Sequence, residues 1–552
     1  MIEVIVDNRL RMHRDAMPDD FRKSLEATFT HNNPQHAKLV ALGHKYNSEP
    51  KQYVMWRDDT LCQQGYQVFS LPRGGMQKLR DAFDEFDLDY KMTDRRSMGA
   101  PHITGSYVDA WQLGSDLFPK HRLVAWDHQV EMVAAANKYG QILMRAPTGS
   151  GKSAALIKHI AEAQVPALVI IYDTGLLKQW RDCIEKELGI LPADQGIIQG
   201  SKFRLKSITL AMQQTLARWD DAKWARLFYA NKNTGLRQCI FGSVYCDEII
   251  RYSARTFVDF IDHFDCHYRI GVGASEKRKD RKEFIIYDMF GDVRYEVSKK
   301  ELVKKRIIHD VECYVIPTAF HADWYVALKQ DDMLDLEHHK RLLDEMAVDE
   351  ERNVLAVHLI EECVQAGLPT LAFTQWVDHA RRIDAALTAK GIASGLALGG
   401  KQWEEIFDDT IARLRDRKLQ VGCGTFGKLG VGHDIPAVAA GLAVTPIHNN
   451  KGFLEQVKGR ICRTTQGKEN ARILVMWDRL VFGDGPLHNL RAWNEVCRVW
   501  NEWDKRWQDI NEYMKEMRDG RTGTPTTAAN EQGIFLSANQ GGYHDKPKRR
   551  RA

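Results

Sequence analysis

The sequence predicts an α/β protein built from two tandem parallel-sheet lobes, with a small α+β domain before them and a helical extension after them. Strand-like apolar runs alternate with helical periodicity between residues 141 and 250, and a second alternation follows residue 350. Only the first contains a glycine-rich loop between a strand and a helix. The 552 residues also exceed what one hydrophobic core usually organises.

We place the domain boundaries where these patterns change. The expected segments are an N-terminal α+β domain (1–115), a first lobe (116–310), a connecting segment (311–350), a second lobe (351–482), a Trp-rich helical extension (483–519) and a disordered tail with a basic end (520–552). Each lobe is long enough to form its own core.

The N-terminal domain contains one clear strand–turn–helix pattern. Residues 67–80 read as a strand, a Pro-Arg-Gly turn and a helix, and residues 88–92 read as a second strand. Five basic side chains in this region are candidates for neutralising nucleic-acid phosphates: Arg73, Lys78, Arg80, Arg95 and Arg96. A solvated basic helix face explains the same pattern equally well.

Residues 146–153 read Ala-Pro-Thr-Gly-Ser-Gly-Lys-Ser, which fits a phosphate-binding loop. The apolar run 141–144 precedes it as a strand, and 154–160 continues it with helical periodicity, as such a loop requires. The alternative is a chance glycine-rich turn before a helix. The residues predicted to bind a nucleoside triphosphate are Thr148, Gly149, Ser150, Gly151, Lys152 and Ser153. Lys152 is expected to contact the β- and γ-phosphates, and Ser153 to hold Mg²⁺.

A candidate catalytic carboxylate pair follows about a hundred residues later. Residues 239–250 form an apolar strand that ends in Asp247 and Glu248. Asp247 at the strand end is expected to hold Mg²⁺, and Glu248 to orient the attacking water. An Asp-Glu pair in a surface turn is the alternative, and the preceding phosphate loop favours the catalytic interpretation.

Further strand patterns lie at 166–172 and 207–212, with a loop entering a helix at 174–181. Strands that alternate with helices predict a parallel sheet with right-handed crossovers. In the second lobe, helices are expected at 353–363 and 377–387, and strands at 369–373 and 419–423. The second lobe has no phosphate loop of its own.

The C-terminal part carries aromatic residues and then a polar tail. Four tryptophans recur mostly at helical spacing: Trp493, Trp500, Trp503 and Trp507. Such a stripe usually packs against a neighbouring domain, and base stacking is the alternative. From residue 520 onward the composition predicts disorder, and the basic run 546–551 is either a phosphate-binding arm or a solvated terminus.

The composition limits the class of protein. No apolar run approaches the roughly 18 residues of a membrane span, and the first residues lack the pattern of a signal peptide. Ten cysteines occur without any C-x-x-C pair, as expected of reduced packing residues. A cytoplasmic protein is therefore expected, with no membrane partner. The net charge of +4 is small for this length and permits nucleic-acid binding through local patches only.

Four further motifs resemble those of superfamily 2 helicases and translocases, in the branch of XPB-like helicases, UvsW-like phage recombination helicases and the motors of type I and III restriction enzymes. The motifs are Trp126-Asp-His-Gln129, the segment 269–280 beginning Arg-Ile-Gly-Val-Gly-Ala-Ser, the segment 425–436 ending Gly-His-Asp-Ile-Pro, and Gln456-Val-Lys-Gly-Arg-Ile-Cys-Arg463. In order and spacing, the resemblance covers about residues 120–480.

The resemblance implies two RecA-like lobes, ATP and Mg²⁺ as cofactors, and DNA as the partner. It implies that Gln129 reads adenine, that Gly432 and Asp434 contribute to nucleotide binding, and that Thr425 contacts nucleic acid. Gln456, Arg460 and Arg463 would act on the triphosphate from the second lobe, the arginines as arginine fingers. The N-terminal domain resembles, more weakly, a duplex-DNA-binding domain of the same branch.

Three residues depart from the family pattern. Ile250 stands where relatives carry a polar residue that links the ATP site to the 273–275 segment, Gly273 stands where Thr or Ser is usual, and Glu276 replaces Pro. These departures favour translocation or duplex remodelling without robust unwinding.

The expected function is ATP-dependent DNA translocation or unwinding that remodels duplex or branched DNA in recombination, repair or replication, in a bacterial or phage-infected cytoplasm. The alternatives are the motor subunit of a restriction-type complex, an RNA helicase, and an ATP-switched clamp that holds nucleic acid without cycling. The motor is expected to show nucleic-acid-stimulated ATP turnover, and the clamp is not.

Overall fold

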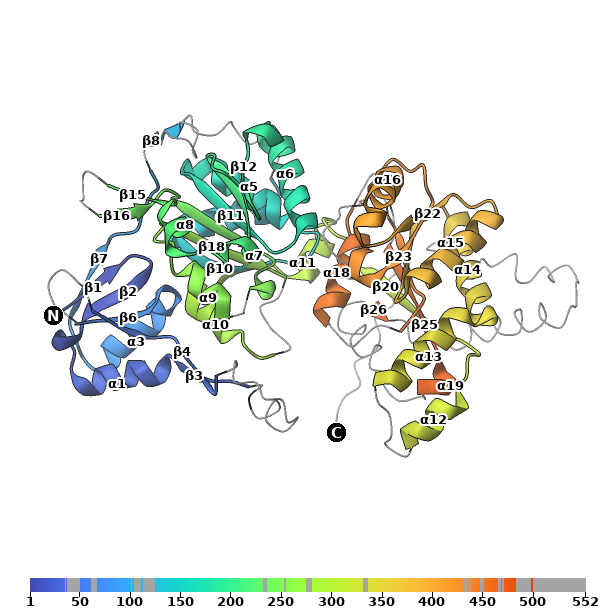
Figure 1. Cartoon of the computed structure of the whole chain (residues 1–552), viewed down its shortest axis with the longest axis horizontal. Helices are drawn as coiled ribbons and strands as arrows, with labels where there is room; N and C mark the ends of the chain where they lie inside the picture. Colours follow the sequence, from blue (N-terminus) through green and yellow to red (C-terminus); the bar gives the residue numbers. More distant parts are fainter. Residues whose placement is uncertain are drawn as a thin grey trace, which may run out of the picture. The chain divides into compact units, whose positions relative to one another are not determined.

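The structure is a computed structural model that forms two compact units, Met1–Ile307 and Ile308–Ala552, each described separately below (Figure 1). The residues described are 1–34, 36, 50–60, 67–100, 102–103, 111–112, 125–231, 236–252, 255–274, 280–330, 336–429, 435, 438–446, 451–464, 468, 471–482 and 498–499. Among them, no helix is both long enough and apolar enough to cross a bilayer.

The first unit begins with a five-stranded sheet of order β5-β6-β2-β1-β7. Its strands are β1 (Ile2–Val6), β2 (Arg9–His13), β5 (Arg57–Thr60), β6 (Gln67–Pro72) and β7 (Tyr90–Asp94), and its helices are α1 (Asp19–Thr28) and α3 (Met76–Glu85). Only β1 and β7 pair in parallel. The predicted strand, turn and helix are confirmed as β6, a single 3-10 turn and α3.

This N-terminal sheet and the first lobe share one hydrophobic core. The same cluster of buried side chains includes Val4 and Phe69 from the sheet and Leu168 and Val244 from the lobe. One face of the N-terminal domain is therefore buried against the first lobe, whereas an independent domain of residues 1–115 would be surrounded by solvent. It is an integral part of a larger unit.

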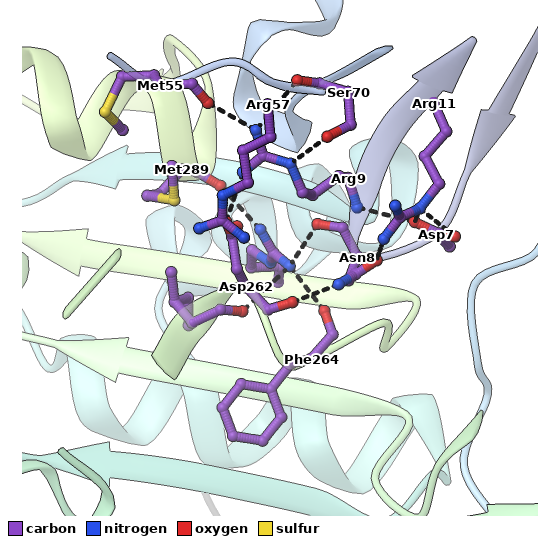
Figure 2. Close-up of polar contacts among 12 residues, drawn as sticks. Asp7, Asn8, Arg9, Arg11, Met55, Arg57, Ser70, Asp262, Phe264 and Met289 are labelled. Carbon is purple, nitrogen blue, oxygen red and sulfur yellow. Dashed lines mark hydrogen bonds and ion pairs between the residues drawn. The ribbon is translucent and has the colours of Figure 1, made fainter. Parts of the chain in front are cut away.

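Buried charges also join the two parts (Figure 2). Arg9 of β2 is 1% exposed, and its Nη1 lies 2.5 Å from the Asp262 carboxylate of the first lobe. Arg57 reaches the same carboxylate oxygen at 3.1 Å, and the amide of Asn8 donates to the backbone carbonyl of Asp262. Because a buried charge is costly unless it is paired, these contacts fix the N-terminal domain on the lobe.

The first lobe is an eight-stranded sheet of order β13-β12-β14-β11-β17-β18-β10-β19, parallel throughout except for the β12–β13 pair. Its strands are β10 (Gln141–Arg145), β11 (Ala167–Ile171), β12 (Gly196–Gln199), β13 (Lys202–Arg204), β14 (Ile208–Met212), β17 (Ser243–Asp247), β18 (Tyr268–Gly273) and β19 (Val293–Glu296). The central strands β11, β14 and β17 are buried along their whole length, as their continuous apolar runs predict. The carboxyl ends of β10 and β17 carry the candidate site.

Helices of the first lobe follow the strands in the predicted alternation. The ones that bear on the site are α4 (Asp127–Tyr139), α5 (Lys152–Ala163) and α6 (Thr174–Leu188), and α10 (Phe284–Phe290) lies toward the N-terminal domain. The helix α5 packs between α4 and α6. This confirms the strand–loop–helix context that the phosphate-loop motif requires.

The second unit contains a seven-stranded, wholly parallel sheet of order β22-β23-β21-β24-β25-β20-β26. Its strands are β20 (Val311–Pro317), β21 (Thr370–Thr374), β22 (Ser394–Ala397), β23 (Val421–Thr425), β24 (Ala440–Ala443), β25 (Ala471–Trp477) and β26 (Arg498–Val499), and helices α14 (Glu350–Gln365), α15 (Val377–Ala389), α16 (Glu404–Arg415) and α18 (Lys451–Ile461) belong to this unit. The predicted second α/β lobe is confirmed.

The segment 311–350 is not a connector, contrary to our expectation. Its first seven residues form β20, which pairs in parallel with β25 over Val311–Pro317, and α12 (Asp323–Gln330) and α13 (Leu336–Val348) follow. Residues 313–316 form an apolar run of strand length, but Glu312 interrupts it and no motif lies beside it. The sequence pattern therefore does not distinguish this strand from a connector.

The C-terminal extension was expected to be helical, and two of its residues form a strand instead. Arg498 and Val499 make up β26, which pairs with Glu312 and Cys313 of β20. The backbone groups at the edge of β20 form hydrogen bonds with any extended segment that lies beside them. Such pairing depends on the fold, so the periodicity of residues 483–519 does not predict it. The predicted Trp stripe (Trp493, Trp500, Trp503 and Trp507) and the basic tail lie outside the described residues.

Candidate functional site

The phosphate loop joins β10 to α5 with two glycines in the left-handed region. Gly149 has φ of 88° and Gly151 has φ of 76°. The backbone conformation favours glycine at Gly151, and a Cβ there would lie 2.4 Å from Nε2 of Gln129 and displace that amide from the loop. The predicted loop conformation depends on these two positions.

The loop fits a phosphate group. The helix α5 has no side-chain cap at its N-terminus and no acidic residue in its first turn, so its N-terminal N–H groups are not taken by a carboxylate. Lys152, at the first position of α5, is only 7% exposed, and its Nζ lies 3.4 Å from Oε1 of Glu248. A buried ammonium beside free helix N–H groups is the arrangement that binds an anionic ligand.

Asp247 ends β17 directly opposite the loop. The hydroxyl of Ser153 donates to Oδ2 of Asp247 at 2.7 Å, and the backbone N–H of Glu248 donates to Oδ1 at 2.9 Å. Burial, followed by the neighbouring carboxylate of Glu248, raises the pKa of Asp247, while Lys152 and the hydrogen bond from Ser153 act in the opposite direction. The serine oxygen keeps a lone pair while it donates its proton, so Ser153 and Asp247 fit the pair of oxygen ligands expected to hold Mg²⁺.

Glu248 is held in an unusual backbone conformation. Its φ of 55° and ψ of 52° lie in the left-handed helical region, which non-glycine residues rarely adopt. The conformation ends β17 abruptly and starts the short turn 249–251, and it leaves the Glu248 carboxylate beside Lys152. Backbone strain of this kind concentrates at functional sites.

The predicted adenine-reading residue Gln129 is packed against the phosphate loop. Its Oε1 accepts from the backbone N–H of Trp126 at 3.0 Å, and its Nε2 donates to the carbonyl of Gly151 at 3.1 Å. The neighbouring His128 is buried and has Nε2 within 2.7 Å of the carbonyl of Ser150. Both side chains therefore support the loop from α4.

Two of the three departures from the family pattern lie among the described residues. Gly273 is the last residue of β18, and its carbonyl accepts the N–H of Ala146 at 3.0 Å. Ile250 lies in the turn after Glu248 and provides no polar side-chain group. Glu276 lies outside the described residues.

In the second unit, Gln456 and Arg460 lie on α18, and Arg463 follows its end. Arg463 forms an isolated antiparallel bridge with Ile308, the first residue of this unit, and the N–H of His309 donates to the carbonyl of Cys462 at 2.7 Å. Thr425 is the last residue of β23. Gly432 and Asp434 lie outside the described residues.

The N-terminal basic residues divide into two groups, which corrects the sequence prediction. Arg73 is 2% exposed and donates to the carbonyl of Cys266 at 2.6 Å and to that of His267 at 3.1 Å, so it joins the N-terminal domain to the lobe and cannot bind DNA phosphates. Lys78 pairs with the buried carboxylate of Asp288 at 2.8 Å.

Arg96 is also paired within the molecule, with Asp94 at 2.6 Å. The carboxylates of Asp288 and Asp94 therefore offset the positive charges of Lys78 and Arg96. Arg80 and Arg95 are exposed and remain candidates for phosphate contacts. The sequence does not distinguish buried from exposed basic residues here. The turn that contains Arg73 has the pattern of a surface turn, and only the contact with the first lobe buries it.

Sequence reasoning missed one residue of the site. Trp180 of α6 is fully buried, and its indole N–H donates to Oδ2 of Asp247 at 3.1 Å. The only available signal was its place at the seventh position of an amphipathic helix that follows a buried strand. That position reads as ordinary core packing.

Comparisons with known proteins agree with this geometry. Residues 120–278 match the family described as Type III restriction enzyme, res subunit. The chain is 28% identical to the DNA 3'-5' translocase XPB2 of Sulfurisphaera tokodaii over 34% of this chain and 39% of that protein. It is 22% identical to the probable helicase D10 of Escherichia phage T5 over 59% of this chain and 65% of that protein.

The chain thus spans less than two thirds of the length of these relatives. Among solved structures, T4 UvsW aligns with 93% of this chain and 97% of its own length, at 12% identity and a TM-score of 0.38. The sequence matches and the phosphate-loop geometry, not this structural alignment, support the assignment. These matches support the predicted resemblance to superfamily 2 helicases and translocases, in the branch that includes XPB-like and phage helicases.

Proposed function

We propose that the protein is an ATP-dependent DNA translocase or helicase that remodels duplex or branched DNA in recombination, repair or replication. The observation that carries the proposal is the convergence of Lys152, Ser153, Asp247 and Glu248 at the carboxyl ends of β10 and β17. A phosphate loop alone binds nucleotide. The two carboxylates beside it supply what hydrolysis needs.

Each side chain has a distinct part in the proposed chemistry. Ser153 and Asp247 would hold Mg²⁺, which neutralises charge on the phosphates when it is bound. Glu248 orients the attacking water once a γ-phosphate draws Lys152 away from it. Arg460 and Arg463 of the second unit act on the developing phosphoryl charge when the two lobes close.

DNA as the substrate rests on the relatives. The archaeal relative is named a DNA 3'-5' translocase, and another, from Kineococcus radiotolerans, is named a DNA 3'-5' helicase. We propose Arg80 and Arg95 as phosphate contacts of the N-terminal domain, because they are the exposed members of the basic set.

One alternative function has a specific observation in its favour. The side chain of Ile250 is apolar and cannot supply the polar side-chain link to the Gly273 segment that the family resemblance implies, so hydrolysis and strand movement would be weakly coupled. An ATP-switched clamp, which binds nucleic acid without repeated turnover, would tolerate this. The match of residues 120–278 to a restriction subunit keeps a restriction-type motor as a second alternative.

ATP turnover by the full chain tests the proposal. The rate is measured without nucleic acid and with single-stranded, duplex, forked and four-way DNA, with single-stranded RNA as a comparison and Lys152→Ala as the inactive control. Stimulation of at least tenfold by duplex or branched DNA is expected. A rate that no nucleic acid changes would favour the clamp, and stimulation by RNA alone would overturn the choice of substrate.

A further inference from the structure

The indole of Trp180 is directed at the carboxylate that is proposed to hold Mg²⁺. Its Nε1 lies 3.1 Å from Oδ2 of Asp247, and both side chains are buried. A fully buried indole N–H needs an acceptor, and most such groups could use a backbone carbonyl. Here the acceptor is the one acidic side chain at the end of β17.

The donor is held in place from two sides. Asp173 caps α6 by accepting the N–H of Leu176 at 2.9 Å, and the helix packs on β11 and β14. Trp180 is 0% exposed and is the largest fully buried side chain among the described residues. Capping and packing of α6 therefore both fix the place from which the indole reaches Asp247.

The hydrogen bonds of Asp247 are unequally distributed. Oδ2 accepts from both Ser153 and Trp180, which occupies both lone-pair positions of that oxygen. Within the part of the chain that the structure describes, Oδ1 accepts the backbone N–H of Glu248 alone. The carboxylate consequently has one defined lone pair left, on Oδ1, and it cannot rotate without breaking the bond to Trp180.

We infer that Trp180 is a positioning residue of the ATP site: its indole N–H fixes the Asp247 carboxylate in the orientation that accepts Mg²⁺. The inference rests on the proposed function, and it assigns to α6 a part in metal binding in addition to packing. Partners that orient a metal ligand from outside typically change metal affinity about 10- to 100-fold when they are removed.

Two substitutions test the donor. Trp180→Phe removes the indole N–H and some volume, and benzothienylalanine at position 180 replaces the N–H by sulfur at nearly constant volume. Binding of Mn²⁺ to the full chain with ADP present is measured by electron paramagnetic resonance, which needs no turnover. Both variants are expected to bind Mn²⁺ about tenfold more weakly, with ADP affinity in EDTA unchanged.

Controls separate this inference from the proposed function. Trp224→Phe removes an equally large buried indole of the first lobe that packs on His263 and Phe264, and it should leave Mn²⁺ affinity unchanged. Asp247→Asn should abolish the site. If Asp247→Asn has no effect, the metal site itself is wrong.

If Asp247→Asn abolishes Mn²⁺ binding and the benzothienylalanine variant binds normally, only the role of Trp180 is overturned. A measurement on the wild-type chain covers the case in which a variant does not fold. The indole N–H of Trp180, labelled with ¹⁵N at that residue alone, should exchange slowly with solvent and change its resonance when Mg²⁺ joins bound ADP. A resonance that does not respond contradicts the inference.

Discussion

At the scale of single residues, the charged and polar groups of the site lie within contact distance of one another. Lys152 and Glu248 lie 3.4 Å apart, and Ser153 and Asp247 are hydrogen-bonded at 2.7 Å. The groups that would contact phosphate and metal are therefore held in a defined arrangement by their own contacts. Glu248 is positioned by a strained backbone and by one ammonium group.

Lys152→Ala should abolish ATP hydrolysis and leave the fold intact. The ammonium lies in a preformed loop at the start of α5, and its removal takes charge from the phosphates without opening the core. Hydrolysis and thermal unfolding are measured together. Lys158→Ala is the control, because Lys158 lies on the same helix and pairs with Glu162 rather than with a group of the site. Normal turnover in a folded Lys152→Ala protein would exclude the loop from the mechanism.

Glu248→Gln should trap a state with both ATP and nucleic acid bound. The substitution removes the carboxylate that orients water and leaves the ligation expected of Ser153 and Asp247 unchanged. A co-sedimentation assay with radiolabelled ATP and duplex DNA measures the trapped complex. Hydrolysis at the wild-type rate would show that Glu248 does not orient the attacking water.

The residues of the site were only partly predictable from the sequence. The phosphate loop and the Asp-Glu pair were predicted because residue type, spacing and flanking strands within a short stretch of sequence indicate them. Trp180 was not predicted, because its hydrogen bond to Asp247 joins positions 67 residues apart. Arg73 was assigned to the wrong function, since its burial depends on the surface of another element.

At the scale of elements, the N-terminal sheet is fixed on the first lobe by buried ion pairs. Arg9→Met should lower the free energy of unfolding of the first unit by about 3–5 kcal/mol, because the buried Asp262 carboxylate loses its closest and most buried ion-pair partner and keeps the pair with the exposed Arg57. Chemical denaturation of the full chain, followed by tryptophan fluorescence, measures the loss. Figure 2 shows the polar contacts that surround Arg9 and Asp262.

Arg11→Met is the matched control. Arg11 lies on the same strand β2, is about one-fifth exposed and pairs with Asp7 at 3.0 Å. Its loss should cost no more than about 1 kcal/mol. Equal effects of the two substitutions would mean that the buried pair does not hold the domain on the lobe. Deletion of the first 115 residues would expose the same buried surface, so it is a poor test of DNA binding.

A buried histidine makes the first lobe sensitive to acid. Burial lowers the pKa of His159 on α5 to about 3, and its Nδ1 lies 2.7 Å from the hydroxyl of Tyr245. Between an unfolded pKa of about 6.5 and the native value, only the unfolded chain takes up the proton. The free energy of unfolding should therefore fall as the pH falls from about 6.5 toward 3, and be constant in this respect above that range.

Denaturation at a series of pH values tests this prediction. The double variant His159→Phe/Tyr245→Phe removes the imidazole and the hydroxyl that would lose its partner, and its stability should fall less steeply in acid. Tyr245→Phe alone keeps the imidazole and should retain the wild-type slope. Parallel curves for wild type and the double variant would assign the acid sensitivity to other groups.

At the scale of the whole molecule, the alternation of strands and helices predicted both α/β lobes but not their limits. We predicted a connector where β20 lies, because its short apolar run stands apart from any motif. In the structure, β20 lies between β25 and β26 in the sheet. The bridge between Ile308 and Arg463 spans more than 150 positions of sequence, so no local pattern could reveal it. The core shared by the N-terminal sheet and the first lobe was hidden for the same reason.

The last prediction concerns the contribution of the second unit to ATP hydrolysis. Arg463 is held through its backbone, by the bridge to Ile308 and by the adjacent bond from His309 to Cys462. Both of these contacts are made by backbone groups, which substitution of the Arg463 side chain does not remove. Arg463→Ala should lower the DNA-stimulated rate of ATP hydrolysis roughly a hundredfold or more while changing nucleotide affinity far less, because an arginine finger acts mainly on the transition state.

Arg463→Lys should restore little of this rate, since a single ammonium cannot reproduce the planar guanidinium fork. Arg413→Ala is the control, because Arg413 is exposed on α16 of the same unit and pairs with Asp409 of the same helix. Stimulated turnover and ADP affinity are measured for all three variants. A full stimulated rate in Arg463→Ala would mean that the second lobe does not complete the active site through this residue. Hydrolysis would then depend on the first lobe alone, and the clamp would explain the molecule better than the motor.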